Sequence, residues 1–215
     1  MTIATSYAEA AEILASRDPV LADLIAAAGP IRISRRTATH FAALVEAIVY
    51  QQLAGAAARA IHGRLVAALN GEIEPEALLA LSDETLRGVG LSANKARSLR
   101  DLATKALDGT VVLAPRRLAR RSDEDVIAAL STVRGIGPWT AQMFLMFSLR
   151  RLDVWPVGDF GVRQGYGLAW KIPMPTAREL EPLGEPYRPY RTVVAWYCWR
   201  AVELHAGAGD SALTR

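Results

Sequence analysis

The sequence predicts an all-α fold, and three observations support that prediction. Apolar residues recur at helical spacing along nearly the whole chain. Alanine, leucine and arginine, which favour helices, are used heavily. Strand signals are sparse, and the clearest of them, residues 110–115, is too short to build a sheet upon. At 215 residues the chain is long enough for one large domain or two small ones with an ample core.

The first half of the chain is expected to form short amphipathic helices that end at glycine. Gly29-Pro30 ends the second helix, Asn70-Gly71 closes the fourth, and Asp108-Gly109 stops the seventh. A break between Gln52 and Gly55 separates the third helix from the fourth. The expected helical segments are 7–16, 19–29, two within 39–71, 74–81, 82–90 and 92–109.

The second half is expected to hold the most buried helix. Ser122 and Asp125 predict a capping box at the start of the helix over 122–133. The segment 140–151 is apolar on nearly all sides and therefore predicts a central, buried helix. After the irregular stretch 152–161, the remaining helical segments are 161–170, 177–180 and 191–204.

The charge balance is mildly basic, with 22% charged residues and a formal net charge of +3. Much of the positive charge occurs in arginine pairs, which are Arg35-Arg36, Arg116-Arg117, Arg120-Arg121 and Arg150-Arg151. Such clusters suit either a solvated surface or a polyanionic partner, and composition does not decide between them.

A single cysteine, Cys198, excludes an internal disulfide and any thiolate-ligated iron–sulfur cluster or zinc site. Because it stands in an aromatic run, we expect it to be buried as a small hydrophobe. The N-terminus lacks the pattern of a signal peptide, and no uncharged apolar run reaches the ~18 residues that a membrane span needs. A soluble, cytoplasmic protein without membrane contact is expected.

The stretch VRGIGPWTAQM, residues 133–143, predicts a tight hairpin between two helices. Gly135 and Gly137 can take positive φ and leave their amides uncovered, while Pro138 and Thr140 suit the start of a helix. The free N–H groups and positive dipole end of that helix would attract an anion such as a phosphate. The alternative is an ordinary helix–helix connection, because the Gly-X-Gly pattern alone is weak.

Five pieces of the chain, in order, resemble the helix-hairpin-helix Gly/Pro/Asp superfamily of DNA glycosylases, with the alkylation-repair branch (3-methyladenine DNA glycosylase II) closest. The resemblance runs from about residue 18 to residue 203, which is most of the chain. The pieces are EAIVYQQLAGAAARAI, GLSANKARSLRDLA, VRGIGPWTAQMFLM, DVWPVGDFGVRQG and PYRTVVAWYCWRA.

This resemblance implies a two-lobed, all-α glycosylase fold with the active-site cleft between the lobes. A central lobe over 35–149 would contain the hairpin, and 1–34 with 150–215 would form the second lobe. The family's catalytic aspartate falls at Asp159, which follows Gly137 by 22 residues and also suits a helix N-cap. Asp153, the other acid nearby, suits a loop surface.

The resemblance also implies a monofunctional enzyme, because Trp139 stands where bifunctional members carry their Schiff-base lysine. Trp139 and Trp199 would line the base pocket, with Phe160 as a third wall and Met143 where some relatives carry tyrosine. Trp196 lies on much the same helix face as Trp199 and is the weaker alternative. An aromatic wall would favour a cationic, alkylated base.

DNA contacts are implied at Gly135, Ile136 and Gly137, together with Thr140 and Arg134, the last standing where relatives usually carry proline. Gln52 aligns with the residue that fills the hole left by the extruded base, although Gln51-Gln52 also suits a plain polar turn. The family's structural cation, monovalent or divalent, would be held by the backbone carbonyls of Ser131, Val133 and Ile136.

The sequence thus predicts a monofunctional glycosylase that excises alkylated purines from double-stranded DNA in base excision repair. It would act as a monomer with no cofactor for catalysis. Two alternatives remain open at this stage: a non-catalytic helix-hairpin-helix module that only binds DNA, and a glycosylase for other damaged bases.

Overall fold

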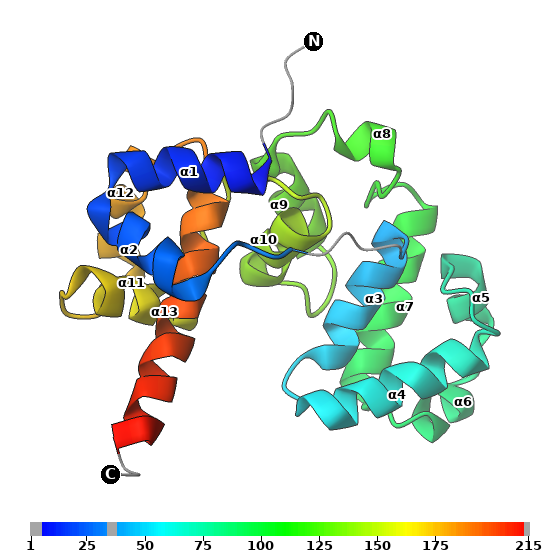
Figure 1. Cartoon of the computed structure of the whole chain (residues 1–215). Coiled ribbons are helices and arrows are strands. Elements are labelled where there is room, and N and C mark those ends of the chain that lie inside the picture. The colour runs from blue at the N-terminus through cyan, green and yellow to red at the C-terminus, as the bar shows by residue number, and fades with distance from the viewer. Residues whose placement is uncertain (1–5, 34–37, 213–215) are drawn as a thin grey trace. The chain divides into compact units, whose positions relative to one another are not determined.

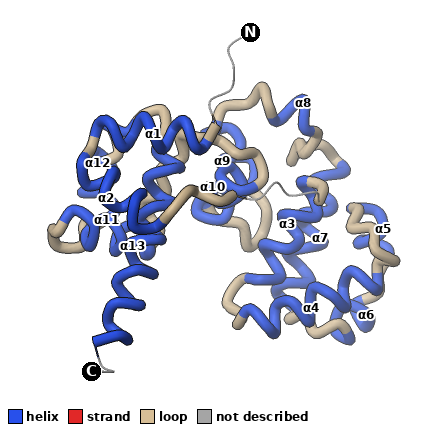
Figure 2. Tube along the Cα trace, in the orientation of Figure 1, coloured by secondary structure: helices blue, strands red, loops and turns tan. Residues whose placement is uncertain are grey.

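The computed structural model describes residues 6–33 and 38–212, and side chains up to residue 206. All regular structure in these residues is helical, as predicted, and they contain no strand (Figure 2). The elements are α1 (Tyr7–Arg17), α2 (Pro19–Ala28), α3 (His40–Tyr50), α4 (Gly55–Ala68), α5 (Pro75–Ala80), α6 (Asp83–Gly88), α7 (Ala93–Leu107), α8 (Pro115–Leu118), α9 (Asp123–Ser131), α10 (Pro138–Phe147), α11 (Phe160–Trp170), α12 (Ala177–Leu183), the 3-10 helix η1 (Glu185–Tyr187) and α13 (Arg191–Ala212).

The chain forms two compact units (Figure 1). Unit 1 consists of Met1–Ser34 and Arg150–Arg215, and unit 2 of Arg35–Leu149. Unit 1 therefore holds α1, α2 and α11 to α13, drawn in blue and in yellow to red, whereas unit 2 holds α3 to α10, drawn in light blue to yellow-green.

Unit 1 is built around the close contact between α11 and α13. At Gly165 the two backbones approach so closely that an added Cβ would lie 1.8 Å from the Cys198 carbonyl oxygen. Cys198 itself is fully buried, as expected, and burial raises the pKa of its thiol, with the charge of Asp159 adding to the shift. The helix pair is therefore a rigid base for the residues at its ends.

A partly buried polar contact joins the two chain segments of unit 1. Asp18 caps α2 through the Val20 amide, and its other oxygen accepts hydrogen bonds from Trp170 Nε1 at 3.1 Å and Tyr187 Oη at 2.7 Å. The Trp170 ring stacks on Tyr166 with centroids 4.0 Å apart. These contacts fix the N-terminal helices to the segment after residue 150.

Serine side chains begin three helices of unit 2. Ser82, Ser92 and Ser122 accept hydrogen bonds from backbone amides in the first turns of α6, α7 and α9. Ser122 accepts from the Asp125 amide, which is one half of the predicted capping box. The order of these helices brings α3 and α7 side by side, with α10 packed on α3 and α9.

The short helix α8 was not predicted, because four residues are too few to show a helical period. It carries Arg116 and Arg117 on its exposed side, with Arg120 exposed just beyond it. Arg35 and Arg36 lie outside the described residues. Within the described chain, no helix is both long and apolar enough to cross a bilayer.

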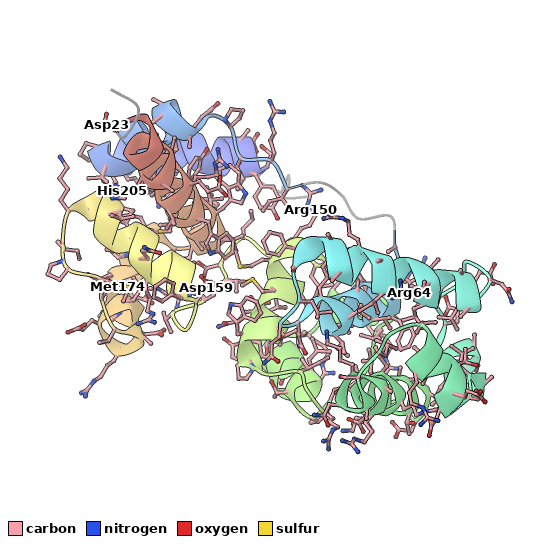
Figure 3. The ribbon with its side chains drawn as sticks, turned by 90° about the horizontal axis from the view of Figure 1, so that it is seen from below. Asp23, Arg64, Arg150, Asp159, Met174 and His205 are labelled. Carbon is pink, nitrogen blue, oxygen red and sulfur yellow. The ribbon has the colours of Figure 1, made fainter. Side chains whose placement is uncertain are left out.

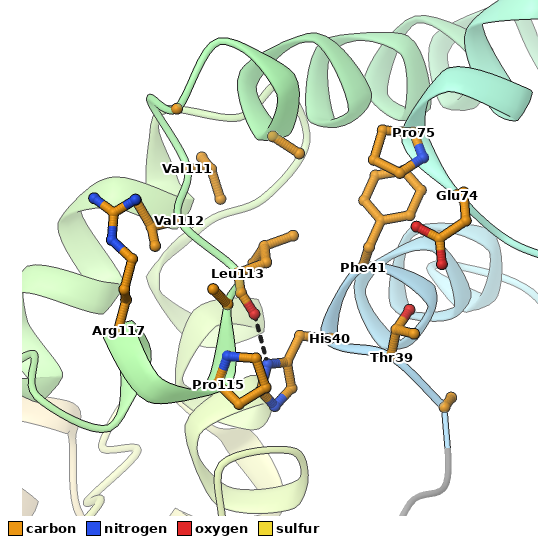
Figure 4. A pocket seen from close by; sticks show the side chains of 14 residues that line it. Thr39, His40, Phe41, Glu74, Pro75, Val111, Val112, Leu113, Pro115 and Arg117 are labelled. Carbon is orange, nitrogen blue, oxygen red and sulfur yellow. Dashed lines mark hydrogen bonds between the residues drawn. The ribbon is translucent and has the colours of Figure 1, made fainter.

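An open pocket of about 440 Å³ lies near the start of α3 in unit 2 (Figure 4). Phe41, Pro75 and Val111 contribute its apolar walls, and His40 Nδ1 lies 2.9 Å from the Leu113 carbonyl oxygen. None of the residues predicted for the functional site lines this pocket.

Candidate active site and DNA-binding hairpin

Asp159 is the N-cap residue of α11 and is labelled in Figure 3 at the N-terminal end of that helix. Its Oδ1 accepts a hydrogen bond of 2.8 Å from the Val162 amide, the contact expected of a capping carboxylate. The residue is only 8% exposed. The helix start thus holds this carboxylate in one orientation.

Trp199 holds the same carboxylate from α13. Its Nε1 donates to Asp159 Oδ1 at 2.9 Å, and an added Cβ on Gly161 would lie 2.8 Å from the Trp199 ring. Trp196 instead packs against Tyr197 and lies beneath the Arg200 guanidinium. Of the two tryptophans considered from the sequence, Trp199 is the one in contact with Asp159; its role as a pocket wall stays a prediction.

Phe160 is the first residue of α11 and is 59% exposed, an unusual fraction for a large aromatic ring. The Arg163 guanidinium lies 5.9 Å from the ring centroid. Phe160 therefore presents an apolar surface directly beside Asp159, which is compatible with the predicted wall.

Asp153 lies in the loop before α11, and its carboxylate, 27% exposed, forms ion pairs. Arg191 donates to it at 2.7 and 3.0 Å, and Arg188 at 2.7 Å. Arg191 is buried, so its charge needs this partner. Asp153 thus anchors the start of α13 to the loop between α10 and α11. This structural role leaves Asp159 as the candidate catalytic acid.

The hairpin between α9 and α10 has the tight turn that its glycines predicted. Gly135 has φ of 78°, and an added Cβ there would lie 2.7 Å from Ser98 Oγ. Gly137 is the N-cap of α10 and gives that helix no side-chain cap, in contrast to the capped starts of α7 and α9. An uncapped helix start after glycines is suited to an external anion.

Two residues predicted to contact DNA are buried. Ile136 is 3% exposed, and its amide donates to the Val133 carbonyl at 3.0 Å. Thr140 is 7% exposed. These two side chains anchor the hairpin in unit 2, so a contact with DNA at either residue would involve its backbone, and that role stays a prediction. The exposed glycines 135 and 137 keep that predicted role.

The face of α10 carries the other predicted pocket residues of unit 2. Trp139 is 48% exposed, although a tryptophan usually buries most of its surface. Met143 lines a cavity of about 240 Å³ between α3 and α10, together with Tyr50 and Phe147. An exposed indole one turn before this apolar cavity is consistent with a surface for a flat base.

The loop after α3 presents Gln52 at its tip, exposed and with φ of 55°. The preceding glutamine holds the loop in place, because Gln51 Nε2 donates to the Gly135 carbonyl at 2.9 Å. Lys95 Nζ donates to the carbonyls of Val49 and Gln51 at 2.6 and 2.8 Å, and partial desolvation lowers its pKa. The predicted wedge loop is therefore tied to the hairpin.

Arg134 is exposed, and its backbone amide donates to Asp101 Oδ2 at 2.7 Å. Asp101 also forms an ion pair of 2.8 Å with Lys105, and Lys105 donates to the Thr132 carbonyl as well. The hairpin is thus supported from α7 through two charged side chains.

Sequence reasoning did not assign Gln51, Lys95, Asp101 or Lys105 to the site. One signal was present, because Asp101 and Lys105 stand four residues apart on an expected helix and so predict an ion pair. Their contacts with the hairpin join segments that are distant in sequence, and the helical periodicity of the sequence does not predict such contacts. The scattered histidines had no expected role, and the described residues contain no group of three or more His, Cys, Asp or Glu side chains that could hold a metal ion.

Comparisons with known proteins identify the family. Residues 45–189 match the family described as HhH-GPD superfamily base excision DNA repair protein. DNA-3-methyladenine glycosylase 1 of Schizosaccharomyces pombe is 36% identical over 164 residues, which cover 75% of this chain and 72% of that protein.

Solved structures agree with the sequence comparison. The 3-methyladenine DNA glycosylase of S. pombe in complex with abasic DNA aligns with a TM-score of 0.77 and 32% identity, covering 89% of this chain and 95% of that one. DNA-3-methyladenine glycosidase of Bacillus halodurans aligns with a TM-score of 0.82 and 34% identity, covering 95% and 92%. The chain therefore belongs to the HhH-GPD superfamily of base excision DNA repair proteins.

Proposed function

We propose that this chain is a monofunctional DNA glycosylase that hydrolyses the N-glycosidic bond of alkylated purines in duplex DNA. The observation that carries the proposal is the Asp159 carboxylate, which is buried and held by both the Val162 amide and the Trp199 indole. A carboxylate fixed in this way is preorganised to stabilise a developing positive charge.

The proposed reaction follows from that charge. As the bond from sugar C1′ to the base nitrogen breaks, its electron pair leaves with the base and positive charge builds on the sugar. Asp159 stabilises this charge, and a water oxygen then bonds to C1′ while its proton passes to a base such as the Asp159 carboxylate. An alkylated purine that already carries positive charge is a good leaving group, so the reaction needs no metal or redox cofactor.

The side chain two residues after Gly137 is not an amine, which supports hydrolysis without strand cleavage. Trp139 occupies the position that resemblance assigns to the Schiff-base lysine of bifunctional members, and an indole cannot form a Schiff base. Its exposed ring would instead stack on the extruded base, where a cation–π contact of about 0.5–2 kcal/mol favours a cationic one.

Backbone recognition is assigned to the hairpin. The uncapped start of α10 would receive one phosphate, and Gln52 at the exposed loop tip would fill the space of the extruded base. In this assignment the partner is double-stranded DNA, and one copy of the chain binds it.

Release of free base from methylated duplex DNA tests the proposal against a module that only binds DNA. We expect the wild-type protein to release methylated purines under single-turnover conditions, detected by chromatography, and to leave a strand that is cut only after alkali treatment. Salt-sensitive duplex binding without release of methylated or any other damaged base would contradict it. Cleavage of the strand before alkali would contradict the monofunctional assignment.

A further inference from the structure

The carbonyl end of α9 already has a positive charge bound to it. Lys105, on α7, donates its ammonium group to the carbonyl oxygen of Thr132, which is the C-cap of α9. The last carbonyls of a helix carry partial negative charge and attract a cation. An ammonium group of one positive charge therefore lies at the carbonyl end of α9, beside the hairpin.

Asp101 fixes that ammonium group in place. Its Oδ2 lies 2.8 Å from Lys105 Nζ and also accepts the Arg134 amide at 2.7 Å. The side chains of Lys105 and Asp101 are 24% and 31% exposed, so solvent only partly screens the pair. Partial burial alone would raise the pKa of Asp101, but the hydrogen bonds from Lys105 and Arg134 outweigh it and hold that pKa below its usual value.

The bond from residue 134 to Asp101 depends on a feature of this sequence. Residue 134 is arginine and has the backbone N–H that a proline at this position would lack. The arginine therefore supplies the amide that joins the hairpin to Asp101. Asp101 and Lys105 then bind the turn at Arg134 and at Thr132, on either side of Val133.

The residues expected to hold a metal ion fit it poorly beside this pair. The expected ligands are the carbonyls of Ser131, Val133 and Ile136, of which the Val133 carbonyl accepts the Ile136 amide at 3.0 Å and keeps one lone pair. The intervening Thr132 carbonyl holds the Lys105 ammonium. A second cation at these neighbouring carbonyls would be repelled by that charge.

We propose that Lys105, held by Asp101, is the resident cation of the hairpin and replaces a bound metal ion. The ammonium group neutralises the end of α9 and fixes the turn whose glycines grip the DNA backbone. Lys105 is thus a positioning residue, since it acts through the turn and does not touch the substrate. The part of this proposal that concerns DNA rests on the proposed function.

The test compares cations at equal ionic strength. Binding to a short duplex that carries a tetrahydrofuran abasic analogue is measured in potassium, ammonium and choline chloride, of which choline cannot coordinate carbonyls. The variants are Lys105→Ala, which leaves room for a small cation, Lys105→Met, which removes the charge but fills the space, and Lys171→Ala, which removes one exposed charge from unit 1.

We expect the wild type and Lys171→Ala each to bind equally well in all three salts. Lys105→Ala should bind about tenfold more weakly in choline, the effect of losing one charged hydrogen bond, and recover in potassium or ammonium. Lys105→Met should stay weak in every salt. A wild-type affinity that falls about tenfold in choline overturns the proposal, as does a Lys105→Ala variant that neither cation restores.

Melting temperatures of the same proteins in the same salts separate this proposal from the proposed function. Choline should lower the melting temperature of Lys105→Ala but not that of the wild type. If the wild type fails to bind the duplex in any salt, the proposed function fails, and the melting temperatures alone then decide the role of Lys105: equal values for Lys105→Ala in all salts would overturn it.

Discussion

At the scale of single residues, Asp159 Oδ1 receives hydrogen bonds from two different elements, the amide of Val162 on α11 and the indole of Trp199 on α13. A side chain held only as an N-cap needs the first bond alone. The second bond fixes the carboxylate relative to α13, and this added constraint is what a preorganised catalytic group requires.

Replacing Trp199 by phenylalanine should therefore reduce catalysis while keeping an aromatic ring. Loss of one hydrogen bond to a charged group lets the carboxylate leave its working orientation, and we expect a roughly tenfold lower rate of base release. Single-turnover chromatography measures that rate. The matched control is Trp196→Phe on the same helix face, which should release base at the wild-type rate. Equal rates of base release for the two variants would contradict the positioning role of Trp199.

At the scale of elements, the side chain of Gln51 joins the loop after α3 to the hairpin, whereas its neighbour Gln52 does not. Gln51 bonds to the Gly135 carbonyl and Gln52 is exposed at the tip. The same substitution at residue 51 and at residue 52 therefore distinguishes the role of the supporting hydrogen bond from the role of the exposed side chain.

Gln51→Glu removes the amide donor and places a carboxylate oxygen against a carbonyl oxygen. We expect the free energy of unfolding to fall by about 1–3 kcal/mol, measured by urea denaturation. Gln52→Glu should stay within about 0.5 kcal/mol of the wild type, because an exposed tip makes no such bond. If Gln51→Glu is as stable as Gln52→Glu, the link between loop and hairpin contributes nothing.

The crossing of α11 and α13 tolerates no side chain at Gly165, where an added Cβ meets the backbone of Cys198. Backbone cannot move aside as the end of a flexible side chain can. Gly165→Ala should therefore lower the free energy of unfolding by about 3 kcal/mol or more, measured by urea denaturation.

Gly158→Ala is the matched control in the same unit, since nothing lies within 4 Å of its Cβ position. It should change stability by less than about 1 kcal/mol. A Gly165→Ala variant as stable as this control would show that α11 and α13 can separate without cost.

At the scale of the whole molecule, the sequence predicted most helices because their apolar periods are long and their caps are local. Ser122, Gly135 and Asp159 each act within a few residues of their own position, so the expected cap or turn appears in the structure. The four-residue helix α8 lacks such a period and was missed.

Contacts between distant segments could not be predicted in the same way. The side chain of Lys95 reaches the end of α3, and that of Lys105 reaches the end of α9. In each pair the two partners are far apart in the sequence. Burial of Ile136 and Thr140 also depends on packing against other helices, which a local pattern of hairpin residues does not specify. Sequence thus located the hairpin but not what supports it.

The proposed function assigns the chemistry to the Asp159 carboxylate, and a comparison of the wild type with Asp159→Asn isolates the contribution of its charge. Asparagine keeps the shape and can still cap α11, so melting temperature and duplex affinity should be unchanged. Rate constants for base release from methylated duplex DNA are measured under single-turnover conditions. We expect the variant to be slower by about a hundredfold or more, the effect of removing one aimed electrostatic group. Similar rates for both proteins would contradict the assignment of Asp159.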